Sequence, residues 1–171
     1  MDCIVGKSYP TRLGRLHLLE RPDVSRLLVE IPEELALPIG DADMRVHPRM
    51  LACLQTWLEE MAKFCQGRAG AQNTSPTFGK LYLTSAYRAL GTTAGYGEYA
   101  DCCGALDSQD DYGHWSGWAI DCPTRTTRES FSPIITIEEC RLSAERAGLV
   151  RPFAEEWWHF RPRREIIPDE G

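Results

Sequence analysis

The stretch from Tyr112 to Cys122 reads Tyr-Gly-His-Trp-Ser-Gly-Trp-Ala-Ile-Asp-Cys. It contains one imidazole, His114, and one carboxylate, Asp121. A second stretch, Glu155 to Phe160, reads Glu-Glu-Trp-Trp-His-Phe and adds another imidazole and two carboxylates. A catalytic zinc site consists of three protein ligands, an open position for water and a general base. The two stretches together contain side chains for such a site.

The spacing of His114 and Asp121 favours a site built from a loop and a strand. On one helix the two residues would share a face but lie about 10 Å apart along the axis, which is too far for ligands of one zinc ion. On one strand their odd separation would place them on opposite faces. We therefore predict that His114 lies in a loop and that the strand after it carries Gly117, Ala119 and Asp121 on one face. Gly117 would let the backbone turn and pass close to the metal.

Three motifs stand in order along the chain: Ser85-Ala86-Tyr87-Arg88, His114-x-x-Gly117-x-Ala119-x-Asp121 and Glu156-Trp157-Trp158-His159-Phe160. Together they resemble the motifs of the zinc D-Ala-D-Ala metallopeptidases, the dipeptidases and carboxypeptidases of peptidoglycan metabolism and vancomycin resistance. The resemblance covers Ser85 to Phe160. It implies the zinc fold that this family shares with lysostaphin-like enzymes and hedgehog signalling domains.

The resemblance implies a role for each motif residue. His114, Asp121 and His159 would be the ligands of one Zn²⁺ ion. Glu156, just before the strand that carries His159, would be the general base that takes a proton from zinc-bound water. Arg88 would stabilise the oxyanion of the tetrahedral intermediate.

Three further residues are candidates for contact with the substrate: Tyr112, Ser85 and Trp158. Of Trp157 and Trp158, one is expected to pack in the core and the other to line the pocket. Tyr112 stands where the family usually has Ser, and Ala86 stands where Gly is common. The resemblance implies a small peptide or peptidoglycan fragment with D-amino acids as the substrate. Because of these two departures, D-Ala-D-Ala itself is not necessarily the best substrate. The alternative is a zinc-bearing binding module of the same fold that does not catalyse a reaction.

Composition narrows the remaining possibilities. A chain of 171 residues, 43% hydrophobic and 26% charged, is typical of one globular domain. Its net charge of −6 argues against nucleic acid as the partner. No apolar run is long enough to span a membrane, and no signal peptide is recognisable, so we expect a cytoplasmic protein. The seven cysteines show no paired spacing and are expected to be reduced thiols, while the oligomeric state stays open.

The order of the predicted elements indicates a single α+β domain over 1–171, with a small, mainly antiparallel sheet and flanking helices. The zinc site that the resemblance implies would lie on strand ends and loops of this domain. Residues 1–45 are expected to be an irregular N-terminal wrap with one strand candidate at 27–29, 46–162 the core and 163–171 a tail. The elements expected within the core are a long helix from Pro48, a strand over 80–84, a loop over 89–113 at the rim of the site, a polar linker over 123–132, a helix from the Thr136–Glu139 capping box to Gly148 and a last strand with His159.

Overall fold

The computed structural model describes residues 25–68, 79–88, 114, 116–131 and 133–163, and the backbone of two strands at 8–11 and 14–17. Its helices are η1 (Ser25–Leu27, a 3-10 turn), α1 (Pro48–Cys65), α3 (Thr124–Glu129) and α4 (Ile137–Arg146). Its strands are β1 (Ser8–Thr11), β2 (Gly14–His17), β3 (Val29–Glu30), β4 (Ala36–Pro38), β5 (Arg45–Val46), β6 (Leu81–Leu83), β7 (Ile120–Asp121), β8 (Leu149–Val150) and β9 (His159–Pro162). The predicted α+β class is confirmed, with small and mostly antiparallel sheets.

The long helix α1 begins and faces the core as its sequence predicts. Pro48 occupies the first turn, and the ring of His47, which precedes it, accepts a hydrogen bond from the backbone N–H of Arg49 at 3.2 Å. The apolar residues recur every three to four positions, and one side of the helix is buried. Its buried residues are Met50, Cys53, Leu54, Trp57, Met61 and Cys65.

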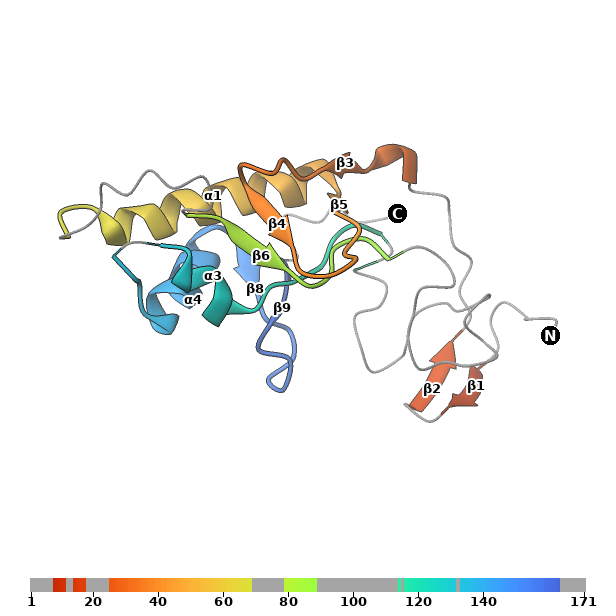
Figure 1. Cartoon of the computed structure of the whole chain (residues 1–171). Helices are drawn as coiled ribbons and strands as arrows, with labels where there is room; N and C mark the ends of the chain where they lie inside the picture. The colour runs from red at the N-terminus through yellow and green to blue at the C-terminus, as the bar shows by residue number, and fades with distance from the viewer. Residues whose placement is uncertain are drawn as a thin grey trace.

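The core lies where α1 meets α4 and the sheet that contains β9. Trp57 of α1 packs against Phe160 of β9 with ring centroids 4.8 Å apart, and its indole N–H donates to the carbonyl of Cys140 on α4 at 3.0 Å. Helix α4 starts at the predicted capping box, with reciprocal hydrogen bonds between Thr136 and Glu139. Figure 1 shows α1 lying across the sheets, with α3 and α4 on one side of them.

The sheets around the site are linked through single backbone bridges. Strands β7, β9 and β8 form one antiparallel sheet in that order, whereas β4 and β6 pair in parallel. The chain after β6 pairs with β7, because the N–H of Asp121 donates to the carbonyl of Ser85 at 2.8 Å. The N–H of Thr84 in turn donates to the carbonyl of Asp121 at 2.9 Å. The motifs around Ser85, Asp121 and His159 therefore lie on three adjacent segments.

The N-terminal region is more regular than predicted. Of the strand candidate at 27–29, only Val29 is in a strand, and Leu27 belongs to the 3-10 turn. Strands β3, β4 and β5 also fall in or at the edge of the stretch expected to be irregular, and Ile31 and Leu35 are part of the buried core. The division between a wrap at 1–45 and a core from 46 is wrong for these residues, because their strands pair with β6 and with each other.

The polar linker predicted over 123–132 contains a helix instead, α3. Thr127 on this helix is fully buried, and its hydroxyl accepts the backbone N–H of Tyr82 in β6 at 3.1 Å. That hydroxyl also bonds the thiol of Cys122, at 3.1 Å. A stretch rich in threonine has low helix propensity, so packing against β6 and α4 decides its conformation. The predicted rim over 89–113 lies outside the described residues.

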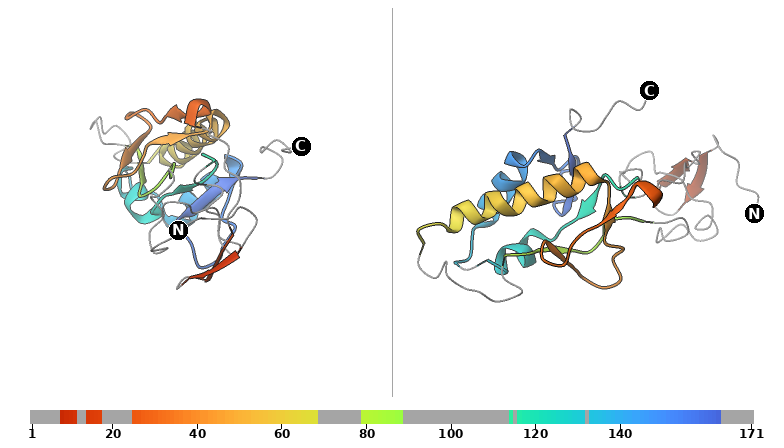
Figure 2. Two further views of the ribbon diagram at one scale, coloured as in Figure 1. Left: turned by 90° about the vertical axis from the view of Figure 1, so that its right-hand side faces the viewer. Right: turned by 90° about the horizontal axis from the view of Figure 1, so that it is seen from above.

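Figure 2 shows the same elements from two further sides, with the hairpin of β1 and β2 to one side of the helices. Within the described residues, no helix is both long and apolar enough to cross a membrane. The four cysteines of the described part, Cys53, Cys65, Cys122 and Cys140, are buried free thiols.

Candidate metal centre

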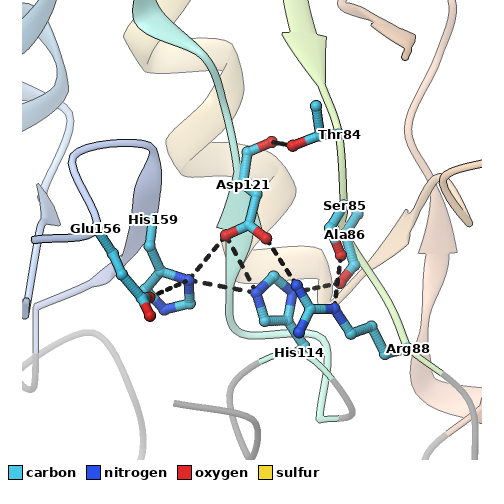
Figure 3. Close-up of polar contacts among 8 residues, drawn as sticks. All are labelled: Thr84, Ser85, Ala86, Arg88, His114, Asp121, Glu156 and His159. Atoms are coloured by element: carbon cyan, nitrogen blue, oxygen red, sulfur yellow. Dashed lines mark hydrogen bonds and ion pairs between the residues drawn. The ribbon is translucent and has the colours of Figure 1, made fainter. Parts of the chain in front are cut away.

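Three side chains from separate parts of the chain converge in a buried group. Asp121 is on β7, His159 is the first residue of β9 and pairs with Asp121 across the sheet, and His114 lies just before the turn at 116–117. Only 2% of His114, 6% of Asp121 and 2% of His159 is exposed. Figure 3 shows the two imidazoles and the carboxylate pointing toward one another. In the described part of the chain, this is the group whose donor atoms could hold a metal ion.

The distances between the three facing atoms fit a metal site. His114 Nε2 lies 3.3 Å from His159 Nδ1 and 3.3 Å from Asp121 Oδ1, and His159 Nδ1 lies 2.9 Å from Asp121 Oδ1. Ligands at about 2.0–2.1 Å from a tetrahedral metal ion are about 3.3–3.4 Å from each other. The three atoms are therefore close to the positions that three ligands of one tetrahedral ion would take, and the two imidazoles and carboxylate suit such an ion chemically.

A backbone carbonyl orients the first of these ligands. The Nδ1 of His114 lies 2.7 Å from the carbonyl oxygen of Ala86. A carbonyl can only accept a hydrogen bond, so Nδ1 carries the proton and Nε2 presents its lone pair to the site. Histidine ligands of metal ions are commonly fixed in this way. The sequence contained no signal for this contact, because a backbone atom of an alanine makes it.

Arg88 contacts the carboxylate of the site. Its Nη2 donates to Asp121 Oδ2 at 2.7 Å, and its Nε donates to the hydroxyl of Ser85 at 2.9 Å. Burial by itself would raise the pKa of Asp121, but the hydrogen bond from His159 and the positive charge of Arg88 hold that pKa well below its usual range. Asp121 is therefore a carboxylate whose two oxygens have different neighbours: Oδ1 faces the imidazoles and Oδ2 faces the guanidinium.

Glu156 lies beside the group on the turn that precedes β9. Its Oε2 is 4.0 Å from His159 Nδ1, and its backbone carbonyl accepts the N–H of His159 at 3.0 Å. The Glu156 side chain is one-quarter exposed, so its carboxylate lies between the buried ligands and solvent. Glu155, its neighbour, is exposed. A carboxylate in the position of Glu156 can exchange protons with a molecule bound at the three donor atoms.

The remaining predicted residues have mixed outcomes. Ser85 lies in the site, where its hydroxyl accepts the hydrogen bond from Arg88. Neither tryptophan is in the core, since Trp157 is 40% exposed and Trp158 is half-buried. Both lie in the turn that precedes β9, and their rings meet edge to face with centroids 5.4 Å apart. Tyr112 lies outside the described residues.

Two predictions about the stretch before β7 are corrected. His114 has a helical backbone where a loop was expected, and β7 contains only Ile120 and Asp121, so Gly117 and Ala119 precede it. Gly117 does turn the chain, with a φ of +79°. However, the close approach that it permits is to the junction of β5 and α1, because a Cβ there would lie 2.8 Å from the backbone nitrogen of His47.

Cys122, next to Asp121, is not part of the group. Its thiol is buried against Thr127, on the other side of β7, because successive residues of a strand face opposite sides. Burial raises the pKa of this thiol to about 12, so it is protonated at neutral pH.

Neither a protein-family model, nor a curated protein, nor a solved structure matches this chain. The assignment of the site therefore depends on the structure of this chain alone. It defines a buried group of two histidines and one aspartate that could hold a metal ion.

Proposed function

We propose that this protein is a zinc-dependent peptidase or amidase that hydrolyses short peptides. The observation that carries this proposal is the buried triangle of donor atoms from His114, Asp121 and His159, with edges of 2.9–3.3 Å and a carboxylate beside it. Two imidazoles and one carboxylate form a ligand set that leaves a tetrahedral zinc ion one open position.

Zinc supplies Lewis-acid polarisation of the scissile carbonyl and a lowered pKa for water. Glu156 is the group that accepts the proton of the attacking water and passes it to the leaving amine. Its partial exposure supports this role, because a carboxylate in contact with solvent can exchange the proton that it takes up. Glu155 is the competing candidate, but it is the carboxylate of Glu156 that lies 4.0 Å from His159 Nδ1.

Arg88 is assigned two functions. Its hydrogen bond to Asp121 Oδ2 leaves Oδ1 directed at the two imidazoles, so it fixes the orientation of the ligand carboxylate. Its positive charge also lies at the edge of the site, where it would stabilise negative charge that develops on the substrate carbonyl oxygen. The hydroxyl of Ser85 holds the other edge of the guanidinium, which supports Ser85 as a positioning residue for Arg88.

The substrate class rests on the resemblance of the three motifs to the D-Ala-D-Ala metallopeptidases. It indicates a peptide with a D-amino acid at the scissile bond, of the D-Ala-D-Ala or peptidoglycan stem type. Two partly exposed tryptophans, Trp157 and Trp158, lie next to Glu156 along the chain and offer apolar surface for such a peptide.

The test combines metal analysis with hydrolysis assays. Purified protein should contain about one zinc ion per chain, and His114→Ala should lose it, because a two-ligand site binds zinc far more weakly. His47→Ala, which removes a described histidine outside the group, is the matched control. Release of free amino acid is then measured from a dipeptide, a tripeptide and a pentapeptide stem ending in D-alanine, with all-L controls.

Each result of this test has a defined meaning. Full zinc content in His114→Ala would refute the ligand assignment. Hydrolysis of the L-peptides alone would refute the D-specific substrate class. A protein that holds zinc and cleaves none of these peptides would be the non-catalytic zinc-bearing module.

A further inference from the structure

A polar hollow lies on the opposite side of β9 from the metal centre. It has a volume of about 260 Å³ and lies between α4, β8 and β9. Phe160 lines it, and because successive residues of a strand face opposite sides, His159 is directed away from it. Figure 1 shows α4, β8 and β9 next to one another.

Three arginines from three segments meet at this hollow. Arg141 comes from the middle of α4, Arg151 directly follows β8 and Arg163 directly follows β9. Glu145 is the one carboxylate among the lining residues, so three positive charges and one negative charge leave a formal charge of +2. No ion pair joins any of the three arginines to a carboxylate within the described residues. Since the whole chain carries a net charge of −6, this cluster is a local exception.

The hydrogen bonding of two of these arginines differs in a way that points to a ligand. Arg163 is held in place, because its Nη2 donates to the carbonyl of Glu145 at 2.8 Å and its backbone N–H donates to the carbonyl of Gly148 at 2.8 Å. Arg141 has a buried Nε with no hydrogen-bond partner in the described part of the chain. Buried donors nearly always have a hydrogen-bond partner, so a ligand with an acceptor atom would satisfy the Nε of Arg141.

We propose that this hollow binds a phosphate group. A phosphate monoester carries about −1.5 to −2 charges at pH 7, which matches the local charge of +2. The planar guanidinium donates pairs of hydrogen bonds to phosphate oxygens, which is the geometry that arginine supplies and lysine does not. The hollow has the volume of roughly nine waters at about 30 Å³ each, so it has room for the phosphate and a few attached atoms. This site is independent of the proposed peptidase activity.

The test is calorimetric titration of the full chain with inorganic phosphate, glycerol phosphate and acetate at constant ionic strength. We expect one phosphate per chain. Arg141→Gln should weaken binding about tenfold or more, the lower end of what a charged hydrogen bond contributes. Arg146→Gln, a change of the same charge on the same helix at a residue that does not line the hollow, should leave binding unchanged.

Further variants keep the proposal open to refutation. Arg151→Gln, at an exposed position, should also weaken binding, and it guards against an Arg141→Gln protein that fails to fold. His114→Ala should still bind phosphate, because the metal centre lies on the other side of β9. The proposal is overturned if phosphate does not saturate, if acetate binds as tightly, if Arg146→Gln weakens binding as much as Arg141→Gln, or if His114→Ala abolishes it. Tighter binding of glycerol phosphate than of inorganic phosphate would identify a phosphorylated small molecule as the ligand, and the reverse order would identify free phosphate.

Discussion

Gly117→Ala should destabilise the protein strongly, because the position combines a left-handed backbone with a close contact. Its φ is +79°, and a Cβ would lie 2.4 Å from Leu28 Cδ2 and 2.8 Å from the backbone nitrogen of His47. The Leu28 side chain can move, but the backbone of His47 is fixed between β5 and α1. The same backbone nitrogen donates to the carbonyl of Gly117 at 2.9 Å, so any shift that relieves the contact also strains that hydrogen bond.

The chain offers a matched control in Gly40, whose φ is +71° and where a Cβ would have nothing within 4 Å. A left-handed backbone costs an L-residue about 1–2 kcal/mol, and both variants have this cost. Gly117→Ala adds about 1–3 kcal/mol for forced repacking and about 1 kcal/mol for the strained hydrogen bond. The difference between the two variants is therefore about 2–4 kcal/mol in the free energy of unfolding.

Thermal unfolding followed by circular dichroism measures this difference. For a domain of this size, each kcal/mol corresponds to about 2–4 °C in Tm. We expect Gly117→Ala to melt at least about 4 °C below Gly40→Ala. Equal melting temperatures for the two variants would refute the argument from the close contact at Gly117, whatever the effect of either change alone.

Three further predictions concern catalysis. Glu156→Gln should keep the metal and lose turnover by about a hundredfold or more, because an amide accepts no proton from water, while Glu155→Gln stays active; the reverse result would exchange their roles. Arg88→Lys should lower kcat despite its charge, since an ammonium cannot hold Asp121 and Ser85 together as the planar fork does; unchanged kinetics would leave Arg88 with a structural role only. Tyr112→Ser should shift the ratio of kcat/KM values toward D-Ala-D-Ala, and an unchanged ratio would show that Tyr112 does not contact the substrate.

Local sequence patterns were enough to predict the helices and strands whose signal lies within one short stretch of sequence. The period of three to four residues and Pro48 predicted α1, and the Thr136–Glu139 box predicted where α4 begins. The alternation around Leu81–Leu83 predicted β6, and the final strand was placed at His159. The members of the metal group were also identified from sequence, because side-chain type and motif order mark them even when their positions in space are unknown.

Tertiary contacts decided what these patterns could not. The helix α3 forms in a threonine-rich stretch because Thr127 is buried against β6, and β4 pairs with a strand more than 40 residues further along the chain. Likewise the carbonyl of Ala86 determines which nitrogen of His114 carries the proton. Arg88 binds Oδ2 of Asp121 and leaves Oδ1 facing the imidazoles. These contacts join residues 28 to 45 positions apart or are made by backbone atoms, so no local periodicity and no side-chain type encodes them. The sequence determined which groups the site contains, and the packing of β6, β7 and β9 determined which atoms of those groups face each other.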